Sequence, residues 1–494
     1  MNAPRYYPDL EGFKEKTKSA NIVPVCRDIL ADMDTPVSAF LKIDSGKDAF
    51  LLESVEGGEK QGRYSFLGIG PRAVLKAKAR NIEIVEHGQR RTEKGDPIEA
   101  LKAMLANYRA APVEGVPRFS GGAIGYMGYD AVRYIERLPD TAEKDLDVPD
   151  LYFIFTDAFL AFDNIEHKIK VISNAYIEEG SDPEAAYRRA IEKIDSLVDS
   201  LRRKAPERKV AFLPSVGAEV TSNFSKKDFL SAVRKAKKYI VDGDIIQAVI
   251  SQRFSTALDV DPFDIYRALR VVNPSPYMFF LRLSDMCLVG SSPEILVRAD
   301  GNSVNVRPIA GTRKRGKDEA EDALLEKELL SDPKERAEHI MLVDLGRNDL
   351  GKVCDAGTVE VDNLMTVEKY SHVMHIVSNV KGKLMNGYGP FDSLRACFPA
   401  GTLTGAPKIR AMEIIEELEP VKRGVYGGSV GYFSYSGGMD MCIAIRTMVI
   451  KDGRIYMQAG AGIVADSVPE KEYEETVNKA TALLKAVELA REGS

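Results

Sequence analysis

The sequence predicts an α+β fold. Segments with helical periodicity and segments with β-type alternation both recur along the 494 residues, but they do not follow the regular β-α-β order that builds a parallel sheet. No internal repeat is apparent. Hydrophobic residues make up 44% of the chain, so it can bury a large core. Its length indicates roughly two to four structural units.

Composition excludes several functional classes. A net charge of −6 gives no electrostatic footprint for nucleic acid. No uncharged apolar run is long enough to span a membrane, and the N-terminus lacks the apolar segment of a secretion signal, so we expect neither nucleic-acid nor membrane partners. The five cysteines are scattered without a C-x-x-C pair, which predicts reduced thiols in the cytoplasm and neither disulfides nor a zinc site.

The first part of the chain consists mainly of short apolar runs, with a few helical patterns between them. The apolar runs alternate or are continuously apolar, and turn residues such as DSGKD at 44–48 bound them, as expected for strands. We expect a short helix at 25–33, strands at 39–43, 49–54, 64–67, 73–78, 82–86, 151–162 and 168–173, and helices at 97–108 and 183–203.

A polar, proline-containing stretch at 204–222 marks a change in organisation. We therefore expect an N-terminal region at 1–205, a connection at 206–223 and a second region at 224–490. In the second region, the helix that follows Ser225 should end near Gly243, because glycine favours a helix end. The further elements expected there are strands at 245–254, 277–283, 286–291 and 294–299, and helices at 333–345, at 408–417 and after Pro469.

Two of these helices carry paired glutamates. Glu335 and Glu338 lie on one helix, and Glu472 and Glu475 on the last, each pair three residues apart and so on one face. Carboxylate oxygens are ligands that Mg²⁺ accepts alongside several waters, so the two faces together would make a magnesium site. Acidic pairs of this spacing are also common on solvated helix surfaces, which is the alternative.

Acids, bases and a loop offer further chemistry. Glu294 follows the turn residues GSSP at a strand start, where burial would raise its pKa and make it a proton donor. His372 and His375 share one apolar run, where a histidine is either catalytic or structural. Thr402 lies in FPAGTLTGAPKIR, a turn-rich loop that leads into a helix. The N–H groups of such a junction favour an anion, unless the loop is an ordinary surface connection.

Groups that could bind an anion lie in the second region as well. Arg446 can bind a carboxylate through two hydrogen bonds. Gly460 and Gly462 allow backbone N–H groups to approach a ligand, although a β-bulge would also explain them. The basic segment RPIAGTRKR has Gly311 and Thr312 at its centre.

Taken in order, these motifs resemble those of the chorismate-utilising enzymes. The motifs are RPIAGTR, the helix with the first glutamate pair, VDLGRND, YSHVMH, PAGTLTGAPK, YGG, QAGAGIV and NKA. Within that family the chain is most similar, over nearly its whole length, to the large synthase component of anthranilate synthase. The resemblance implies antiparallel β-sheets packed as a sandwich with flanking helices, in two intertwined subdomains. It also implies a regulatory, tryptophan-binding N-terminal region and a chorismate-binding catalytic region.

The resemblance also implies roles for individual residues. The catalytic set is Glu294, His375 and Thr402. The Mg²⁺ set is Glu338 and Glu475 directly, with Glu335 and Glu472 acting through water. The chorismate-binding set is Gly311 and Thr312, which line the ring together with Thr402, and Tyr426, Arg446, Gly460, Ala461 and Gly462, which hold the enolpyruvyl carboxylate.

Two positions favour ammonia as the nucleophile. Ala310 stands where similar aminodeoxychorismate synthases usually have lysine, and Gln247 stands where isochorismate and salicylate synthases have a lysine that activates water. The resemblance therefore implies conversion of chorismate and ammonia to anthranilate and pyruvate. The alternatives are an aminodeoxychorismate or isochorismate synthase, or a non-catalytic relative that binds tryptophan.

Partners and an inhibitor follow from the same comparison. The chain has no Gly-x-Cys-x-Gly elbow, so a separate glutamine amidotransferase subunit is expected to supply ammonia. LLES, which ends at Ser54, and NPSPYM, which contains Pro276, Tyr277 and Met278, resemble the tryptophan-binding elements of feedback-inhibited members. LLES by itself would be no more than a strand end, but the pair predicts inhibition by tryptophan.

Overall fold

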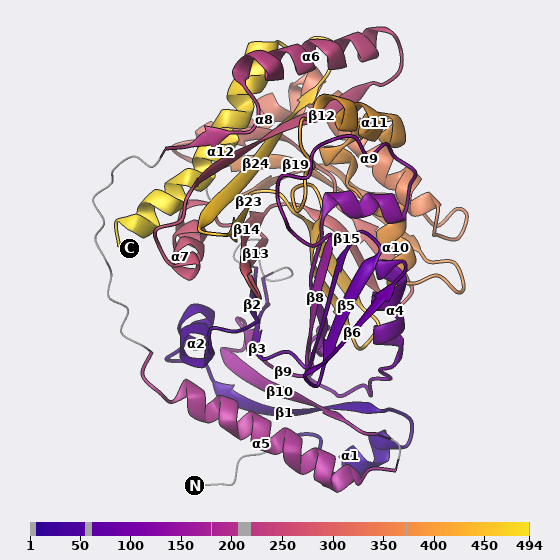
Figure 1. Ribbon diagram of the computed structural model, residues 1–494, viewed down its shortest axis with the longest axis vertical. Coiled ribbons are helices and arrows are strands. Elements are labelled where there is room, and N and C mark those ends of the chain that lie inside the picture. Colours follow the sequence, from indigo (N-terminus) through magenta and orange to yellow (C-terminus); the bar gives the residue numbers. More distant parts are fainter. Residues whose placement is uncertain (1–5, 55–61, 179, 206–218, 371–372, 494) are drawn as a thin grey trace.

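The computed structural model describes residues 6–54, 62–178, 180–205, 219–370 and 373–493. Two large antiparallel β-sheets pack face to face, and helices cover their outer faces (Figure 1). The predicted α+β class and the sandwich of antiparallel sheets are confirmed.

The first sheet combines strands from both ends of the chain. Its strands in spatial order are β1 (Ile22–Leu30), β10 (Lys168–Tyr176), β9 (Ala158–Asp163), β3 (Tyr64–Ile69), β2 (Ala49–Glu53), β13 (Tyr277–Leu283), β14 (Met286–Ser292), β23 (Thr447–Lys451), β24 (Arg454–Ile463), β12 (Gln247–Ala257) and β11 (Thr221–Ser222), with β20 (Gly405–Ala406) beside β12.

The second sheet is built in the same way. Its strands in spatial order are β17 (Ile309–Lys314), β19 (Val373–Lys383), β16 (Ser303–Val306), β15 (Ile295–Asp300), β22 (Met439–Ile443), β21 (Ser429–Ser434), β7 (Gly122–Met127), β8 (Leu151–Thr156), β4 (Ala73–Lys78), β5 (Asn81–Glu86) and β6 (Gln89–Lys94), with β18 (Glu360–Lys369) beside β19.

In each sheet a single strand pair joins the strands that precede residue 205 to those that follow residue 219. In the first sheet this pair is β2 with β13, where Glu53 lies opposite Met278. In the second it is β7 with β21, where Met127 lies opposite Ser429. We call these two strand pairs the seams.

Helices form the outer layers and the rim. Their bounds are α1 (Leu10–Thr17), α2 (Pro36–Ile43), α4 (Pro97–Ala106), α5 (Pro183–Leu201), α6 (Lys226–Val241), α7 (Pro262–Val272), α8 (Glu319–Ser331), α9 (Pro333–Gly351), α10 (Pro390–Cys397), α11 (Lys408–Leu418) and α12 (Pro469–Arg491), with 3₁₀ turns η1 (Tyr129–Tyr134) and η2 (Gly401–Leu403). The amphipathic α5 and α12 pack on the outer face of the first sheet, toward opposite ends of the molecule (Figure 1). Within the described ranges no helix is long and apolar enough to cross a membrane.

The predicted helix at 25–33 is wrong. Those residues belong mainly to β1, which pairs with β10 along all nine residues from Ile22 to Leu30. The run contains several β-branched side chains, and its first five residues are buried, which suits a strand covered on both faces.

The predicted strand at 39–43 is also wrong, because it forms the end of α2. Thr35 caps this helix by accepting a hydrogen bond from the Ser38 N–H, the Ser38 hydroxyl accepts one in return from the Thr35 N–H, and Pro36 occupies the first turn. The buried Ala39, Phe40 and Ile43 share one helix face. The capping residues lay just outside the apolar run from which the strand was predicted.

Candidate active site

Two neighbouring crossings between the sheets position the first site residues. Glu294 lies where the chain leaves β14 in the first sheet and enters β15 in the second. Arg446 lies where the chain returns from β22 to β23. Backbone hydrogen bonds hold the crossings together. The Ile443 N–H donates to the backbone carbonyl oxygen of Glu294 at 2.9 Å, and the Ser291 N–H donates to that of Arg446 at 3.1 Å.

Glu294 is buried between these crossings. Burial raises the pKa of its carboxyl from 4.5 to about 8, although the Thr402 hydroxyl, the Arg446 charge and the Ile309 N–H each oppose the shift. At neutral pH the side chain is therefore a protonated acid. The structure brings Glu294, Thr402 and Arg446 together, as the sequence predicted.

His375 lies on β19 beside Gly311, the position at which the register of β17 shifts. Its Nδ1 is 2.9 Å from the Gly311 carbonyl oxygen and 3.0 Å from the Thr312 hydroxyl. Because a carbonyl only accepts, Nδ1 carries the proton and the lone pair of the neutral ring is on Nε2. Burial lowers the pKa of His375, the hydrogen bond to Gly311 opposes this, and the Arg446 charge lowers it further. His372 lies outside the described residues.

The Gly460–Gly462 segment of β24 has no side chain on the face toward the site, and we call this segment the glycine floor. It pairs with β12 in regular register, Ser251 opposite Gly460, so the β-bulge explanation is wrong. A Cβ atom on Gly460 would lie 2.8 Å from the Tyr426 hydroxyl, and one on Gly462 would lie 2.6 Å from the Gln247 amide nitrogen. The two glycines are needed because these side chains approach the backbone closely. Ala461 between them is buried on the other face of the strand, toward α6 and α11.

Four glutamates from α9 and α12 gather at one end of this floor. Burial raises the pKa of Glu338, and the charges of Glu335 and Glu475 raise it further. Burial also raises the pKa of Glu472, to which the Glu475 charge adds. The charges of Glu335 and Glu475 both act on Glu338, so α9 and α12 place these carboxylates within electrostatic range of one another, while the Glu475 side chain itself is 47% exposed.

We tested whether this cluster suits a divalent cation. Over the part of the chain that the structure describes, no three His, Cys, Asp or Glu side chains are close enough to enclose a metal ion. The Lys479 ammonium supplies positive charge instead, at 2.7 Å from Glu475 and 3.0 Å from the Gly460 oxygen. Hard oxygen donors that repel one another, next to an ammonium group, are a donor set that suits Mg²⁺.

Two lysines in this cluster were not predicted from the sequence. The charges of Lys334 and Lys479 both lower the pKa of Glu338 and of Glu472. Lys479 belongs to the NKA motif, and Lys334 immediately precedes Glu335, so both were within reach of the sequence. Neither was identified because a lysine next to helix glutamates is usual on a protein surface.

Electrostatic effects and close approaches connect Glu294, His375, the glycine floor and the acidic cluster. The Arg446 charge reaches both Glu294 and His375. Gly311 connects His375 to α9, because a Cβ at Gly311 would lie 3.1 Å from the Glu335 carboxylate. The Tyr426 hydroxyl faces the Gly460 N–H, and the Glu475 charge raises the pKa of Tyr426. The segments that carry these residues are up to about 180 positions apart in sequence, which the numbering of Glu294 and Glu475 shows.

Gln247 and Ala310 flank the site. Gln247 is buried at the start of β12, with its amide nitrogen toward Gly462 and its amide oxygen without a hydrogen-bond partner. Ala310 is buried next to Gly311. Neither position provides an ammonium group.

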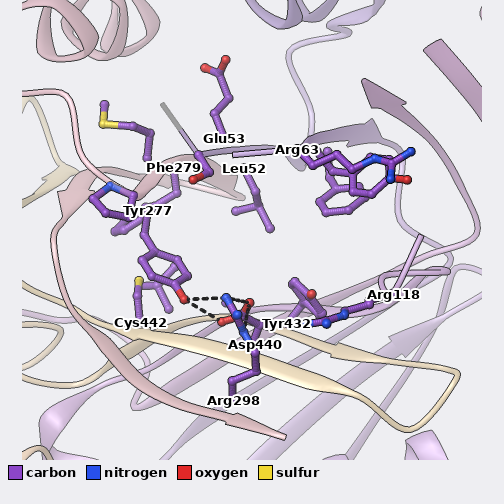
Figure 2. A pocket seen from close by; sticks show the side chains of 17 residues that line it. Leu52, Glu53, Arg63, Arg118, Tyr277, Phe279, Arg298, Tyr432, Asp440 and Cys442 are labelled. Carbon is purple, nitrogen blue, oxygen red and sulfur yellow. Dashed lines mark hydrogen bonds and ion pairs between the residues drawn. The ribbon is translucent and has the colours of Figure 1, made fainter. Parts of the chain in front are cut away.

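A separate cavity of 360 Å³ lies between the seams (Figure 2). The residues predicted to bind tryptophan, Ser54, Pro276, Tyr277 and Met278, all line it. Its walls carry aromatic rings, including Phe279 and Tyr432, and both signs of charge. At one side Tyr277 donates to Asp440 at 3.0 Å, and Arg298 donates to Tyr277 at 3.1 Å.

Comparison with known proteins agrees with these observations. The family model described as chorismate binding enzyme matches residues 47–485. Anthranilate synthase component 1 of Acetivibrio thermocellus is 51% identical over 493 residues, covering 99% of both chains. The protein of the same name from Aquifex aeolicus is 49% identical over 490 residues, covering 98% of both.

Solved structures show the same fold. The crystal structure of anthranilate synthase component I from Streptococcus pneumoniae superposes with a TM-score of 0.78 at 38% identity, covering 92% of this chain and 98% of that one. The isochorismate synthase MenF from Escherichia coli has a TM-score of 0.69 at 19% identity, covering 97% and 98%, and shows the fold alone. The chain therefore belongs to the chorismate-binding enzymes, in the group that includes anthranilate synthase component 1.

Proposed function

We propose that this chain converts chorismate and ammonia to anthranilate and pyruvate, with Mg²⁺ as cofactor and tryptophan as inhibitor. The observation that carries the proposal is the pairing of opposite protonation states at one site. Glu294 keeps its proton near pH 7, while His375, next to the same Arg446, is neutral with a free lone pair. An acid and a base held apart in this way suit a reaction that first protonates a leaving group and then removes a ring proton.

In the first step ammonia adds to the ring and the ring hydroxyl leaves. Glu294 would give its proton to the departing oxygen, so that water leaves and hydroxide does not. The Thr402 hydroxyl next to the carboxyl would then stabilise the carboxylate that forms. Ring contacts from Gly311 and Thr312 would hold the ring over these groups.

In the second step the aminated ring loses pyruvate and becomes aromatic. The lone pair on Nε2 of His375 would accept the ring proton, because Nδ1–H is already committed to Gly311. Arg446, Tyr426 and the N–H groups of the Gly460–Gly462 segment would hold the enolpyruvyl carboxylate during this step.

The acidic cluster provides the cation site in this proposal. Glu338 and Glu475 would hold Mg²⁺, and Glu335 and Glu472 would act through its waters. When bound, Mg²⁺ would withdraw electron density from the ring through its carboxylate. Lys479 would release Glu475 as the cation arrives, since the two charges compete for the same carboxylate.

Ammonia would come from a separate glutamine amidotransferase subunit. Glutamine hydrolysis by this route needs an activated cysteine thiolate. All five cysteines of the chain are free, four are buried, and burial raises the pKa of each, to about 11 for the partly exposed Cys287. No described cysteine is therefore a thiolate near neutral pH.

Tryptophan would bind in the cavity between the seams. The indole ring suits the aromatic wall, and the carboxylate and ammonium groups of the amino acid suit the Arg298 guanidinium and the Asp440 carboxylate that line the cavity. In this proposal residues 1–205 are the regulatory region and 224–490 the catalytic region. The cavity draws on both, because Ser54 and Tyr277 come from opposite sides of one seam.

Turnover of chorismate by the pure chain with ammonium tests the proposal. We expect anthranilate and pyruvate in equal amounts, dependence on Mg²⁺, and inhibition by added tryptophan. Glutamine should replace ammonium only when the amidotransferase is present. Isochorismate or an amino-deoxychorismate as the final product, or glutamine-dependent turnover by the pure chain, would contradict it.

A further inference from the structure

A buried ion pair lies between the Thr402 loop and β12 and has no role in the mechanism above. Arg423 and Glu419 follow α11, with side chains 1% and 4% exposed. The guanidinium donates to both carboxylate oxygens, from Nε at 2.9 Å and from Nη2 at 2.6 Å. This fork geometry fixes the orientation of both groups.

The remaining donors of Arg423 reach two segments that carry site residues. Nη1 donates to the Leu403 carbonyl oxygen at 2.6 Å, next to Thr402 in the turn-rich loop. Nη2 also donates to the Val249 oxygen at 2.7 Å, on β12 directly opposite Gly462. One rigid group therefore joins the Thr402 loop to the strand beside the glycine floor, in addition to the backbone hydrogen bond from the Val249 N–H to the Thr404 oxygen at 2.8 Å.

The same guanidinium supports the tyrosine above the floor. Its central carbon lies 5.7 Å from the centre of the Tyr426 ring and 4.6 Å from that of Tyr129, within the range of cation–π attraction. Arg423 thus contacts three separate segments around the site: the Thr402 loop, the ring of Tyr426, and β12, whose Val249 lies opposite Gly462.

Glu419 extends the support to the neighbouring strand. One of its oxygens accepts from the Ser251 N–H at 2.7 Å and from the Ser251 hydroxyl at 2.8 Å. Ser251 lies opposite Gly460, and its hydroxyl also accepts from the Gln458 amide at 2.8 Å. The carboxylate therefore holds β12 and β24 where the Gly460 N–H faces the site.

Burying two charges is a weak way to stabilise a fold, because desolvation offsets most of their attraction. We propose that Arg423, held by Glu419, is a positioning residue that sets the spacing of Thr402, Tyr426 and the glycine floor around chorismate. The inference rests on the proposed function for its substrate. It identifies a residue that touches no substrate but determines where the substrate contacts lie.

The test replaces the pair by apolar side chains of similar size, Arg423→Met together with Glu419→Leu, so that neither charge is left alone. The matched control is Arg133→Met. Arg133 pairs at 2.6 Å with Glu416 of α11, and its other hydrogen-bond partners, Asp130 and the Pro139 oxygen, belong to none of the predicted site sets. We expect the double variant to keep the melting temperature of the control within a few degrees. Its kcat/KM for chorismate should fall about 10- to 100-fold, the size of effect expected from misplaced substrate contacts.

A double-mutant cycle with Tyr426→Phe separates positioning from general destabilisation. If Arg423 acts through Tyr426, the combined loss in kcat/KM should be smaller than the product of the separate losses. Independent losses, an unchanged kcat/KM in the folded double variant, or an equal loss in Arg133→Met would overturn the inference. If the double variant does not fold, Arg423→Lys provides the same comparison, since lysine keeps the charge but lacks the fork. Wild-type enzyme without turnover would instead refute the proposed function, before any variant is compared.

Discussion

Nδ1 of His375 lies 2.9 Å from the carbonyl oxygen of Gly311, which commits the ring proton to that nitrogen and leaves the lone pair on Nε2. Replacing His375 by Met removes the proposed base and leaves an apolar side chain of similar length. We expect the first step to continue and the second to slow by 10²- to 10⁴-fold, so that the aminated intermediate accumulates. Chromatography of the products measures it, with His167→Asn as an exposed control. Normal anthranilate formation without the intermediate would exclude His375 from this step.

The buried Glu294 carboxyl predicts a pH dependence of turnover. Its pKa is about 8, so its proton is present near pH 7 and is lost as the pH rises through 8. We expect kcat/KM with ammonia to fall above that pH, once the ammonia concentration is corrected for its own ionisation. Glu294→Gln cannot donate the proton and should lower kcat by at least about 100-fold at all pH values. A variant that retained the wild-type profile would show that another group is the acid.

The same carboxyl affects stability. Between its usual pKa of 4.5 and about 8 the folded protein binds a proton that the unfolded chain does not. The contribution of the Glu294 carboxyl to the free energy of unfolding therefore decreases as the pH rises from about 4.5 to about 8. Glu294→Gln should remove that decrease, so the difference in stability between variant and wild type should move in favour of the variant from pH 5 to pH 9. Denaturant titrations at the two pH values measure the change.

Mutual repulsion in the acidic cluster predicts proton release on Mg²⁺ binding. Burial and neighbouring carboxylates raise the pKa of Glu338 and of Glu472, so a cation should displace any protons they hold and should bind more weakly at low pH. Titration calorimetry in two buffers of different ionisation enthalpy measures the protons released. Glu338→Gln should abolish the rise in melting temperature that Mg²⁺ causes, whereas Glu474→Gln, on the exposed face of α12, should not. If Mg²⁺ raised the melting temperature of both variants equally, the cation would bind at another site.

The cavity between the seams, as the proposed tryptophan site, predicts an inhibitor-resistant variant. Leu52 lines the cavity from β2, and Leu52→Phe would fill part of its 360 Å³. We expect tryptophan inhibition to weaken at least about tenfold, because overpacking excludes the ligand, while turnover without tryptophan stays near the wild-type value. Since the chain contains no tryptophan, indole fluorescence reports the bound ligand directly. Undiminished tryptophan binding in this variant, with Leu30→Phe on the exposed surface as control, would place the inhibitor outside the cavity.

The sequence predicted those elements of the second region that carry local signals. The helix after Ser225, the strands around 277–299 and the helix after Asp332 begin with capping residues, or end at turns, that any short window reveals. Two segments of the first region were predicted wrongly. The strand β1 is specified mainly by its pairing with β10, far along the chain, as the register of Ile22 with Tyr176, 154 positions later, shows. Such pairing leaves no local signal.

The site shows the same division. Glu294, His375 and Arg446 stand in motifs, so their neighbours in sequence made them candidates. Arg423 could not, although it lies in the segment before YGG, because its importance depends on three other segments meeting at its guanidinium. Residues that support a site from behind become visible only when the chain is folded.

The seams have a consequence for how the polypeptide can be divided. If residues 1–205 were synthesised without the rest, β2 and β7 would each present an unpaired edge to solvent, and the remaining residues would present β13 and β21. Exposed edges of this kind invite aggregation. Neither fragment is therefore expected to be soluble on its own, but co-expression should allow the two to reassemble, because each holds the complementary edges that the other lacks.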